Sequence, residues 1–270
     1  MKDLQIYTLY SSSAGNCHYI RAGGTHLLFD AGKNAKALTQ GLSDIGADIS
    51  DIDSILITHE HTDHTSALRV LQKKAGDIPI YLHPECADRI ARTGADLSLA
   101  RFVREGDAFC VGEACVRAFR VPHDSDACLG YRIDIDDTDG VISIGIATDI
   151  GHLTCEVAEG LCGCGYVIVE SNHDPEMLKH GPYPDHLKAR IFSAQGHLPN
   201  ESCAKLCAYL CEHGAHHIML AHISVENNDP KCALACTRKA LKGSEAYVVC
   251  ASPDRATCLY DSGKEHLHSC

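Results

Sequence analysis

The stretch Ile55-Leu-Ile-Thr-His59-Glu-His61-Thr-Asp63-His64 joins an apolar segment to four side chains that can bind metal ions. The apolar residues before His59 predict a buried strand, and binding residues are commonly carried by the loops that follow strands. In an extended or turning segment, side chains point to opposite sides, so His59 and His61 can face one way while Asp63 and His64 face the other. One short loop can therefore supply ligands to two adjacent metal ions.

Three further side chains of the ligand type repeat this arrangement. His123, Asp149 and His222 each come directly after an apolar segment that predicts a strand. A single histidine or aspartate in such a place is more often structural than a metal ligand. Taken together with the first stretch, these three residues complete two sets of metal ligands, and we prefer that interpretation.

The composition predicts a globular protein whose single domain spans residues 1–270. Of the 270 residues, 45% are hydrophobic, and no apolar run is long enough to cross a membrane. The first residues predict a strand and do not resemble an export signal, so we expect a cytoplasmic protein with no membrane partner. The 16 cysteines include no C-x2-C pair. We interpret them as reduced thiols that mostly pack in the core, as the repeat Cys203, Cys207 and Cys211 indicates for one helix.

The net charge argues against broad electrostatic contact with nucleic acid. The chain carries 24 basic and 36 acidic residues, which gives a formal charge of −12. Clustered lysines and arginines are what neutralises a phosphate backbone. A nucleic-acid substrate would therefore have to be held by the metal ions and by a local basic strip.

The predicted elements form two blocks, each a run of strands accompanied by helices. The first half carries predicted strands at 4–10, 17–22, 25–29, 54–58 and 80–82, with helices at 34–45, 66–74 and 84–92. From residue 109 onward the chain carries predicted strands at 114–121, 128–135, 141–147, 166–170, 217–220, 246–249 and 257–260, with helices at 153–161, 186–192, 200–213 and 231–241. Such blocks predict two sheets packed face to face with helices outside, a four-layer αββα sandwich of the α/β (α+β) class.

The order of the ligand-type residues resembles the five sequence motifs of the metallo-β-lactamase superfamily. The matching positions are Asp30, the run His59 to His64, His123, Asp149 and His222. The resemblance implies the αββα fold of that superfamily and a centre with two divalent metal ions. It implies two sets of ligands and a bridge: His59, His61 and His123 for one ion; Asp63, His64 and His222 for the other; and Asp149 between both. Asp30 would orient a ligand histidine from behind.

Such a centre implies hydrolysis. Two divalent ions ~3.5–4 Å apart need a bridging carboxylate and a bridging hydroxide, and that hydroxide is a nucleophile near neutral pH. Asp63 could accept a hydrogen bond from the hydroxide and aim it at an electrophile. Histidine and carboxylate ligands suit zinc, manganese and iron alike, so the sequence does not choose the metal.

Short segments along the whole chain resemble the YycJ/WalJ group of bacterial cytoplasmic proteins, which are regarded as 5′-to-3′ exonucleases. They are Ser11-Ser-Ser-Ala-Gly-Asn16-Cys, Val121-Pro-His123-Asp124, Glu170-Ser-Asn-His173-Asp174, Gly181-Pro-Tyr-Pro184, Leu187-Lys-Ala-Arg190-Ile, Gly196-His197-Leu-Pro-Asn200-Glu and Leu220-Ala-His222-Ile-Ser-Val-Glu-Asn-Asn228. Ala14 and Pro199 stand where the group has serine. Neither is an expected ligand, so these departures concern substrate contacts more than chemistry. The resemblance implies a phosphodiesterase or exonuclease acting on nucleic acid, with DNA favoured and a single strand or a 5′ end as the substrate.

Further residues are candidates for catalysis or substrate contact. The resemblance favours His197 near the leaving oxygen or the substrate phosphate, and His173 as a supporting polar residue near the metals. Three others form a turn whose N–H groups and hydroxyls could receive a phosphate: Ser12, Ser13 and Asn16. An ordinary hairpin loop explains that turn equally well. Arg190 is a candidate for phosphate contact, although an exposed helix face is the simpler explanation.

Three other functions remain open. The same centre would permit hydrolysis of a small thioester or lactone, and preference for such an ester over an oligonucleotide would distinguish that reading. A redox enzyme of this fold is disfavoured because di-iron members have Glu where this chain has His61, and no flavin-binding domain follows. A non-enzymatic metal-binding regulatory module is the least favoured, because the complete ligand set leaves a position open for water.

Overall fold

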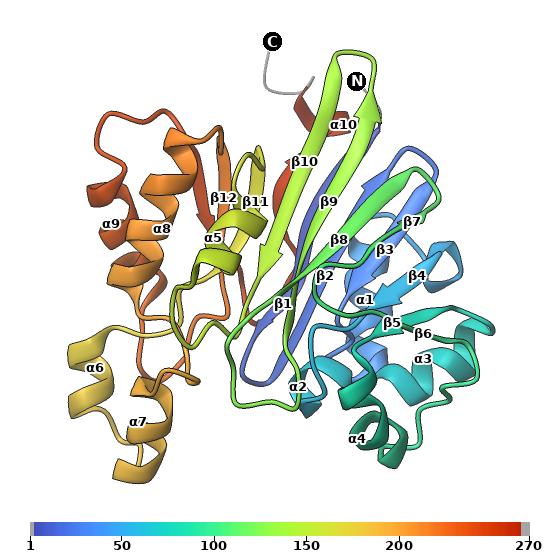
Figure 1. Ribbon diagram of the computed structural model, residues 1–270, viewed down its shortest axis with the longest axis horizontal. Helices are drawn as coiled ribbons and strands as arrows, with labels where there is room; N and C mark the ends of the chain where they lie inside the picture. The colour runs from blue at the N-terminus through green and yellow to red at the C-terminus, as the bar shows by residue number, and fades with distance from the viewer. Residues whose placement is uncertain (1–2, 266–270) are drawn as a thin grey trace.

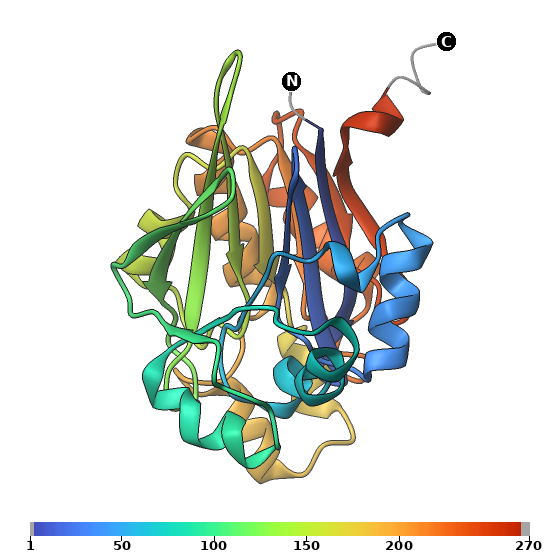
Figure 2. The ribbon, with the colours of Figure 1, turned by 90° about the vertical axis from the view of Figure 1, so that its right-hand side faces the viewer.

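The computed structural model describes residues 3–265, which form two seven-stranded sheets packed face to face (Figures 1 and 2). The first sheet has the order β14-β1-β2-β3-β4-β5-β6, with β1 (Leu4–Ser12), β2 (Gly15–Ala22), β3 (Thr25–Phe29), β4 (Ser54–Leu56), β5 (Ile80–Leu82), β6 (Ala100–Phe102) and β14 (Thr257–Asp261). The second has the order β13-β12-β11-β10-β9-β8-β7, with β7 (Ala108–Val111), β8 (Ala114–Arg120), β9 (Leu129–Asp137), β10 (Gly140–Ala147), β11 (Tyr166–Glu170), β12 (His217–Ala221) and β13 (Tyr247–Cys250).

Helices cover the outer faces of both sheets, so the expected four-layer αββα sandwich is confirmed (Figure 1). The α-helices are α1 (Ala35–Asp44), α2 (Thr62–Thr65), α3 (Leu68–Ala75), α4 (Ala87–Arg92), α5 (Cys155–Leu161), α6 (Pro175–His180), α7 (Asp185–Phe192), α8 (Asn200–Glu212), α9 (Pro230–Ala240) and α10 (Ser262–Glu265), and two short 3-10 turns cover Ile49–Asp51 and Pro84–Cys86. Within the described residues, no helix has the length and apolar character needed to cross a bilayer.

Apolar side chains fill the space between the sheets and the space under the helices. Ile6 and Phe29 from the first sheet meet Tyr131 and Ile146 from the second in a cluster of fully buried residues. Outside the second sheet, the cysteines of α8 behave as the sequence pattern predicts: Cys203 and Cys207 are fully buried beside α5 and α9, and Cys211 is partly buried. Each such side chain stabilises the fold by burying apolar surface.

Parallel strands bring distant loops to one end of the molecule. Strands β3 to β6 are parallel to one another, and so are β10 to β13. Because β9 is antiparallel to both β8 and β10, β8 runs in the same direction as β10. The loops that follow β4, β8, β10, β11 and β12 therefore gather at the end of the sandwich where α2, α6 and α7 lie, at the bottom of Figure 1.

The strand predicted at 257–260 is confirmed as β14, although it pairs with β1 in the first sheet and not with the strands that precede it in the chain. Leu259 and Tyr260 on this strand join the core between the sheets, which long-range packing decides and local pattern does not. Helix α8 begins at Asn200, where the sequence predicts it, with Pro199 as its N-cap residue. The side chain of Asn200 bonds to Ser171 and Asn228.

A single domain over residues 1–270 and a cytoplasmic location stay predictions.

Candidate metal centre

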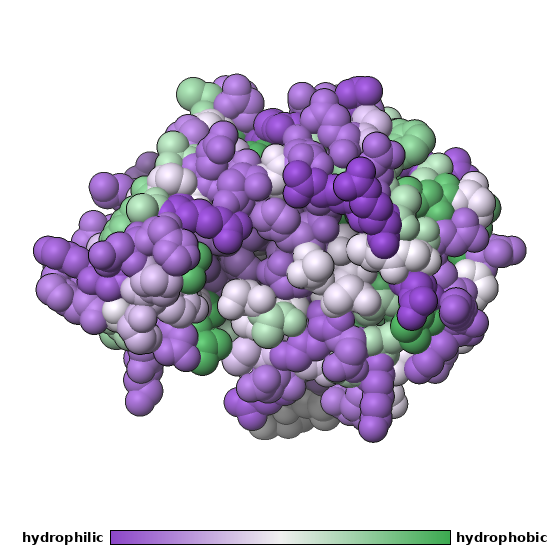
Figure 3. Space-filling model, turned by 90° about the horizontal axis from the view of Figure 1, so that it is seen from below, coloured by the Kyte–Doolittle hydropathy of each residue, from purple (hydrophilic) through white to green (hydrophobic). Residues whose placement is uncertain are grey.

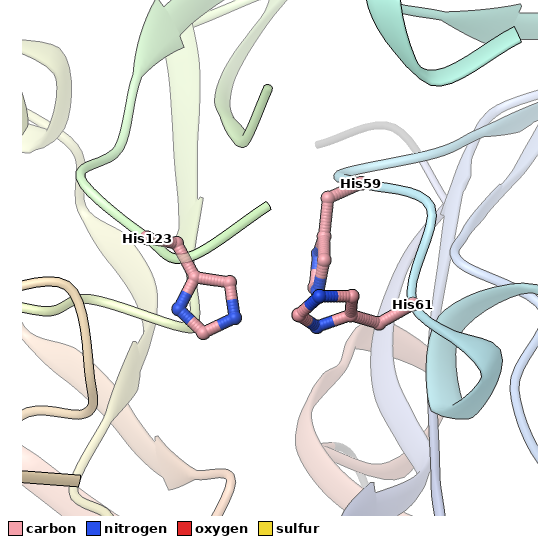
Figure 4. A group of neighbouring side chains, drawn as sticks. All are labelled: His59, His61 and His123. Atoms are coloured by element: carbon pink, nitrogen blue, oxygen red, sulfur yellow. The ribbon is translucent and has the colours of Figure 1, made fainter. Parts of the chain in front are cut away.

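Three imidazoles converge from two loops at this end of the sandwich (Figure 4). His59 and His61 belong to the segment between β4 and α2, and His123 follows β8. The ring centroids are 4.6 Å apart for His59 and His61, 5.0 Å for His59 and His123, and 5.1 Å for His61 and His123. One nitrogen of each ring lies within 4.8 Å of the others. The three rings form one group that could hold a metal ion.

A second group lies next to the first. Asp63 and His64 belong to α2, and His222 follows β12. One ligand atom from each of these residues lies within 4.8 Å of the other two. Asp149 lies between the groups, with Oδ2 3.3 Å from His64 Nε2 and Oδ1 3.8 Å from His123 Nε2. The residues that the sequence assigned to two ligand sets and a bridge are therefore brought together.

In the second group, carboxylates behind the rings fix which nitrogen faces the centre. His64 Nδ1 lies 2.8 Å from Asp30 Oδ2, so Nε2 points toward Asp149. His222 Nδ1 lies 2.8 Å from Glu170 Oε1, so Nε2 points toward Asp63 at 3.7 Å. A carboxylate that holds the far nitrogen of a ligand histidine is a common arrangement behind metal ions.

The first group shows the same pattern with neutral partners. His59 Nδ1 lies 3.0 Å from Thr58 Oγ1, and His123 Nδ1 lies 3.2 Å from the carbonyl oxygen of Gly196. A buried polar atom without a partner costs about 1–3 kcal/mol, so several together need a reason. The buried atoms at this centre without a hydrogen-bond partner are His59 Nε2, His123 Nε2, His222 Nε2 and Asp149 Oδ2. Divalent metal ions fit this donor set, because they would satisfy all four atoms.

Electrostatics separate the histidines into two kinds. Burial is the largest influence on the four buried rings, and it lowers the pKa values of His59 and His123. At His222 the neighbouring carboxylates, Asp149 first, outweigh burial and raise the pKa to about 10. At His64 they raise the pKa well above its usual value for the same reason. Two positive charges therefore already stand where cations would bind.

Backbone strain is concentrated at the centre. Four non-glycine residues of the described chain have positive φ: Asp30 at 63°, Lys33 at 64°, Asp149 at 59° and His222 at 52°. Three of these four carry side chains of the candidate centre. Left-handed backbone is unfavourable for residues with a Cβ and commonly marks functional positions. The turns after β3, β10 and β12 thus hold these side chains in place at a cost in backbone energy.

A family model described as the beta-lactamase superfamily domain matches residues 25–223. The chain belongs to this superfamily. The matched range includes every expected metal ligand from His59 to His222. The exodeoxyribonuclease YycJ of Bacillus anthracis is 32% identical over 241 residues, which covers 88% of this chain and 89% of that protein. The exodeoxyribonuclease WalJ of Streptococcus pneumoniae serotype 2 (strain D39 / NCTC 7466) is 33% identical over 261 residues, 93% of this chain and 95% of that protein.

Among solved structures, the metallo-β-lactamase fold protein YhfI of Bacillus subtilis superposes with a TM-score of 0.67 at 16% identity, covering 94% of this chain and 99% of that one. At that identity the similarity shows the fold alone. Together, the model match and the two relatives confirm the resemblance read from the sequence, including its narrower form in the YycJ/WalJ group.

Glu170 also belongs to the centre of this superfamily member, and the sequence did not reveal its role. Its fully buried carboxylate accepts hydrogen bonds from the backbone N–H groups of Ile150, at 2.7 Å, and Leu198, at 3.0 Å. Oε1 also lies 2.8 Å from Nδ1 of both His197 and His222. Burial would raise the pKa of Glu170, but His197 and His222 lower it to about 2. Its place as the last residue of β11, comparable to that of Asp149 just beyond the end of β10, was the available signal.

The structure separates the two histidines expected to assist catalysis. His197 Nδ1 faces Glu170 and lies 3.7 Å from Asp149 Oδ1, so His197 borders the centre. In the described chain its Nε2 has no hydrogen-bond partner. His173 is in none of the metal-ligand groups; it is buried, and its ring meets that of Phe192 edge to face at 5.4 Å.

The predicted phosphate-binding turn is divided in the same way. Asn16 is buried, and its Nδ2 lies 3.1 Å from His64 Nε2 and 3.3 Å from Asp63 Oδ2. Ser12 is buried and accepts a hydrogen bond from the backbone of Ala14. Ser13 is exposed at the tip of the hairpin. The structure thus places Asn16 at the centre itself and Ser13 outside it, and substrate contact by this turn stays a prediction.

Arg190 lies at the mouth of the centre and not on a featureless helix face. It lines a cavity of about 410 Å³ together with His61 and Asp63. Its guanidinium forms a two-point ion pair with Asp124, with Nη2 3.0 Å from Oδ1. Asp124 therefore already neutralises part of the positive charge of Arg190 that the sequence suggested for phosphate contact.

Proposed function

We propose that the protein is a metal-dependent exonuclease that hydrolyses phosphodiester bonds of DNA at this centre. The observation that carries the proposal is the pair of ligand groups with Asp149 between them, with partnerless nitrogens facing inward. The names of the two relatives, both exodeoxyribonucleases, supply the substrate class. The end of the molecule that holds the centre is mainly hydrophilic and is hollowed near its middle, as Figure 3 shows.

The ligand roles follow the two groups. His59, His61 and His123 would hold one ion, Asp63, His64 and His222 the other, and Asp149 both. When bound, two divalent ions would polarise the phosphate and supply a nucleophile near neutral pH. Their identity, whether zinc, manganese or iron, is left to metal analysis.

The chain's own residues then have distinct tasks. The Asp63 side chain is 22% exposed, so it can accept a hydrogen bond from an attacking water and direct it. Glu170 holds the ring of His197 through Nδ1, so Nε2 is the nitrogen of that ring that can contact the leaving oxygen. Asp30 and Thr58 hold the ring of His64, because Asp30 accepts hydrogen bonds from Thr58 N and Oγ1.

The decisive experiment follows purified protein, loaded with manganese or zinc, on 5′-phosphorylated single-stranded DNA and RNA of matched length. We expect stepwise release of mononucleotides from DNA, loss of this activity on chelation, and recovery when metal is restored. A 3′-labelled strand run in parallel tests the 5′-to-3′ polarity. Protein that holds two ions per chain but leaves both nucleic acids intact would contradict the proposal and favour a thioester or lactone substrate.

Metal binding should release protons, and affinity should rise with pH across the neutral range. At neutral pH the metal-free His222 ring is protonated because its pKa is about 10, and His64 is protonated too because neighbouring carboxylates raise its pKa well above the usual value. Each must lose a proton to offer Nε2 to a metal, whereas His59 and His123 are already neutral. Calorimetric titration with zinc in buffers of different ionisation enthalpy should therefore report two protons released from these rings at neutral pH, and one more where a bound water becomes the hydroxide nucleophile. A binding enthalpy that does not change with the ionisation enthalpy of the buffer would contradict this charge assignment.

Replacing Glu170 with glutamine should weaken catalysis through the histidines it holds. The amide cannot accept hydrogen bonds from both His197 and His222 with the strength of a carboxylate. Loss of such a supporting group typically lowers metal affinity or activity 10- to 100-fold, and we expect about that loss. The pH profile of metal binding should also shift, because a charge that helps to raise the pKa of His222 is gone. An unchanged profile with unchanged metal affinity would argue that Glu170 is merely structural.

A further inference from the structure

A second cavity lies beside the candidate metal centre, and His197 lines it. It has a volume of about 520 Å³, and its other polar lining includes His152, His173, Ser202 and Lys205. Of the described residues that line it, none is an aspartate or a glutamate. The cavity therefore offers an anion a region free of lining carboxylates, one side chain away from Asp149.

The deepest polar group of this cavity has no partner. His173 is 1% exposed, and neither Nδ1 nor Nε2 has a hydrogen-bond partner. Burial is the main reason that its pKa falls to about 4, so the ring is neutral near pH 7 and carries one N–H. Leaving such a buried donor unsatisfied costs about 1–3 kcal/mol. An oxygen acceptor bound in the cavity would remove that cost.

The N-terminus of α8 borders the same cavity. This helix has 13 residues, and its N-cap residue, Pro199, provides no side-chain hydrogen bond to the first turn. Pro199 and Ser202 both line the cavity, so the positive end of the helix dipole adjoins it. Lys205, one turn further on, is exposed and forms no ion pair within residues 3–265. Its ammonium is thus available for a negatively charged ligand.

One apolar group suits a nucleobase. Phe192 lines the cavity at the end of α7 and is 50% exposed, which is high for a phenylalanine. The ring of Phe192 meets the ring of His173 edge to face, with an angle of 89° between the two ring planes, and this contact fixes the orientation of Phe192. Aromatic rings that are exposed in this way stack on bases of single strands without sequence preference, at about 1–3 kcal/mol per base.

We propose that this cavity is a nucleotide subsite that binds a second phosphate of the substrate strand, next to the one being cleaved. The N-terminus of α8, Lys205 and His173 would hold the phosphate, and Phe192 would stack on its base. The proposal rests on the proposed nuclease function, because it takes the strand to lie across Asp149 and His197. The phosphate is either a terminal 5′-phosphate or an internal phosphate of the strand. Binding of suitably modified strands distinguishes the two.

The test measures binding without cleavage. Fluorescence polarisation follows metal-loaded protein with a short, hydrolysis-resistant phosphorothioate single-stranded DNA, in three forms: 5′-phosphorylated, 5′-hydroxyl, and with one internal phosphate replaced by a neutral methylphosphonate. We expect Lys205→Ala to weaken binding of the phosphorylated strand about 5- to 10-fold and to reduce the salt slope, log K against log salt, by about 0.7, the value for one phosphate contact on a single strand. Lys205→Arg should retain most of the affinity.

The matched control is Lys239→Ala, which removes the same charge from the exposed end of α9, outside the cavity lining. His173→Phe fills the same space without polar atoms, and should weaken binding while leaving metal content unchanged. If the wild-type advantage of the 5′-phosphorylated strand over the 5′-hydroxyl strand disappears in Lys205→Ala, the subsite holds the terminal phosphate. If Lys205→Ala abolishes only the loss of affinity that the methylphosphonate causes, the subsite holds an internal phosphate.

Equal loss of affinity in Lys205→Ala and Lys239→Ala, or no binding of any strand, would overturn the subsite. The failure of the nuclease function is a separate result. A protein that binds these strands through Lys205 but does not cleave ordinary DNA would keep the subsite and lose the proposed reaction.

Discussion

Asp149→Asn should yield a folded protein that has lost bound metal and nearly all turnover. The carboxylate of Asp149 is 2% exposed and lies between the two ligand groups, 3.3 Å from His64 Nε2 and 3.8 Å from His123 Nε2. Two cations held close together need a negative charge between them, and an amide provides none. Metal ions in such sites supply several kcal/mol of transition-state stabilisation, so we expect turnover to fall by roughly 10³-fold or more.

Asparagine is the informative substitution because of the backbone. Asp149 has a φ of 59°, which asparagine adopts readily and alanine does not. A loss in Asp149→Asn therefore reports the charge and not strain in the turn after β10. Metal per chain from elemental analysis, with turnover on single-stranded DNA, gives the measurement. Asp139→Asn is the matched control. Asp139 is exposed in the turn between β9 and β10, so this substitution removes the same charge away from the centre. A fully metallated and active Asp149→Asn protein would end the bridging assignment.

The sequence predicts most of the centre because strand ends are visible in it. An apolar run followed at once by His59, His123, Asp149 or His222 indicates both a buried strand and a side chain at its exit. Parallel packing then decides that such exits meet at one end of the sheets. The fold class follows from the same pattern, because two series of strands with intervening helices leave few alternatives.

What the sequence could not give are contacts between distant residues. The double hydrogen bond of Glu170 to His197 and His222 spans β11, the segment before α8 and the turn after β12. The backbone N–H of His222 bonds to Ser11 Oγ, 211 positions away, and this contact attaches the first hairpin to the centre. Short elements such as α2 and α6 were missed as well, because four to six residues carry too little periodicity to identify a helix.

The environment of Asp63 leads to a sharper prediction than its position in the motif. Its Oδ2 lies 3.4 Å from His64 Nε2, 3.7 Å from His222 Nε2 and 3.3 Å from Asn16 Nδ2. Burial would raise its pKa, but the charge of His64 and hydrogen bonds from the two histidines lower it far below the usual range. The carboxylate is therefore ionised at every pH at which the protein would work. It can accept a hydrogen bond but has no proton to give.

Asp63→Asn should consequently lower kcat by about 10²- to 10⁴-fold, the range over which a positioned acid or base acts, with a much smaller change in KM. Because Asp63 is also an expected ligand, metal analysis at low metal concentration should find close to one ion per chain. Titration with excess manganese separates the two roles. If Asp63 only binds metal, excess metal restores kcat; if it also directs the attacking water, as we expect, occupancy recovers and kcat stays low. Wild-type kcat in a fully metallated Asp63→Asn protein would mean that another group orients the nucleophile, and Asp149 would be the first to examine.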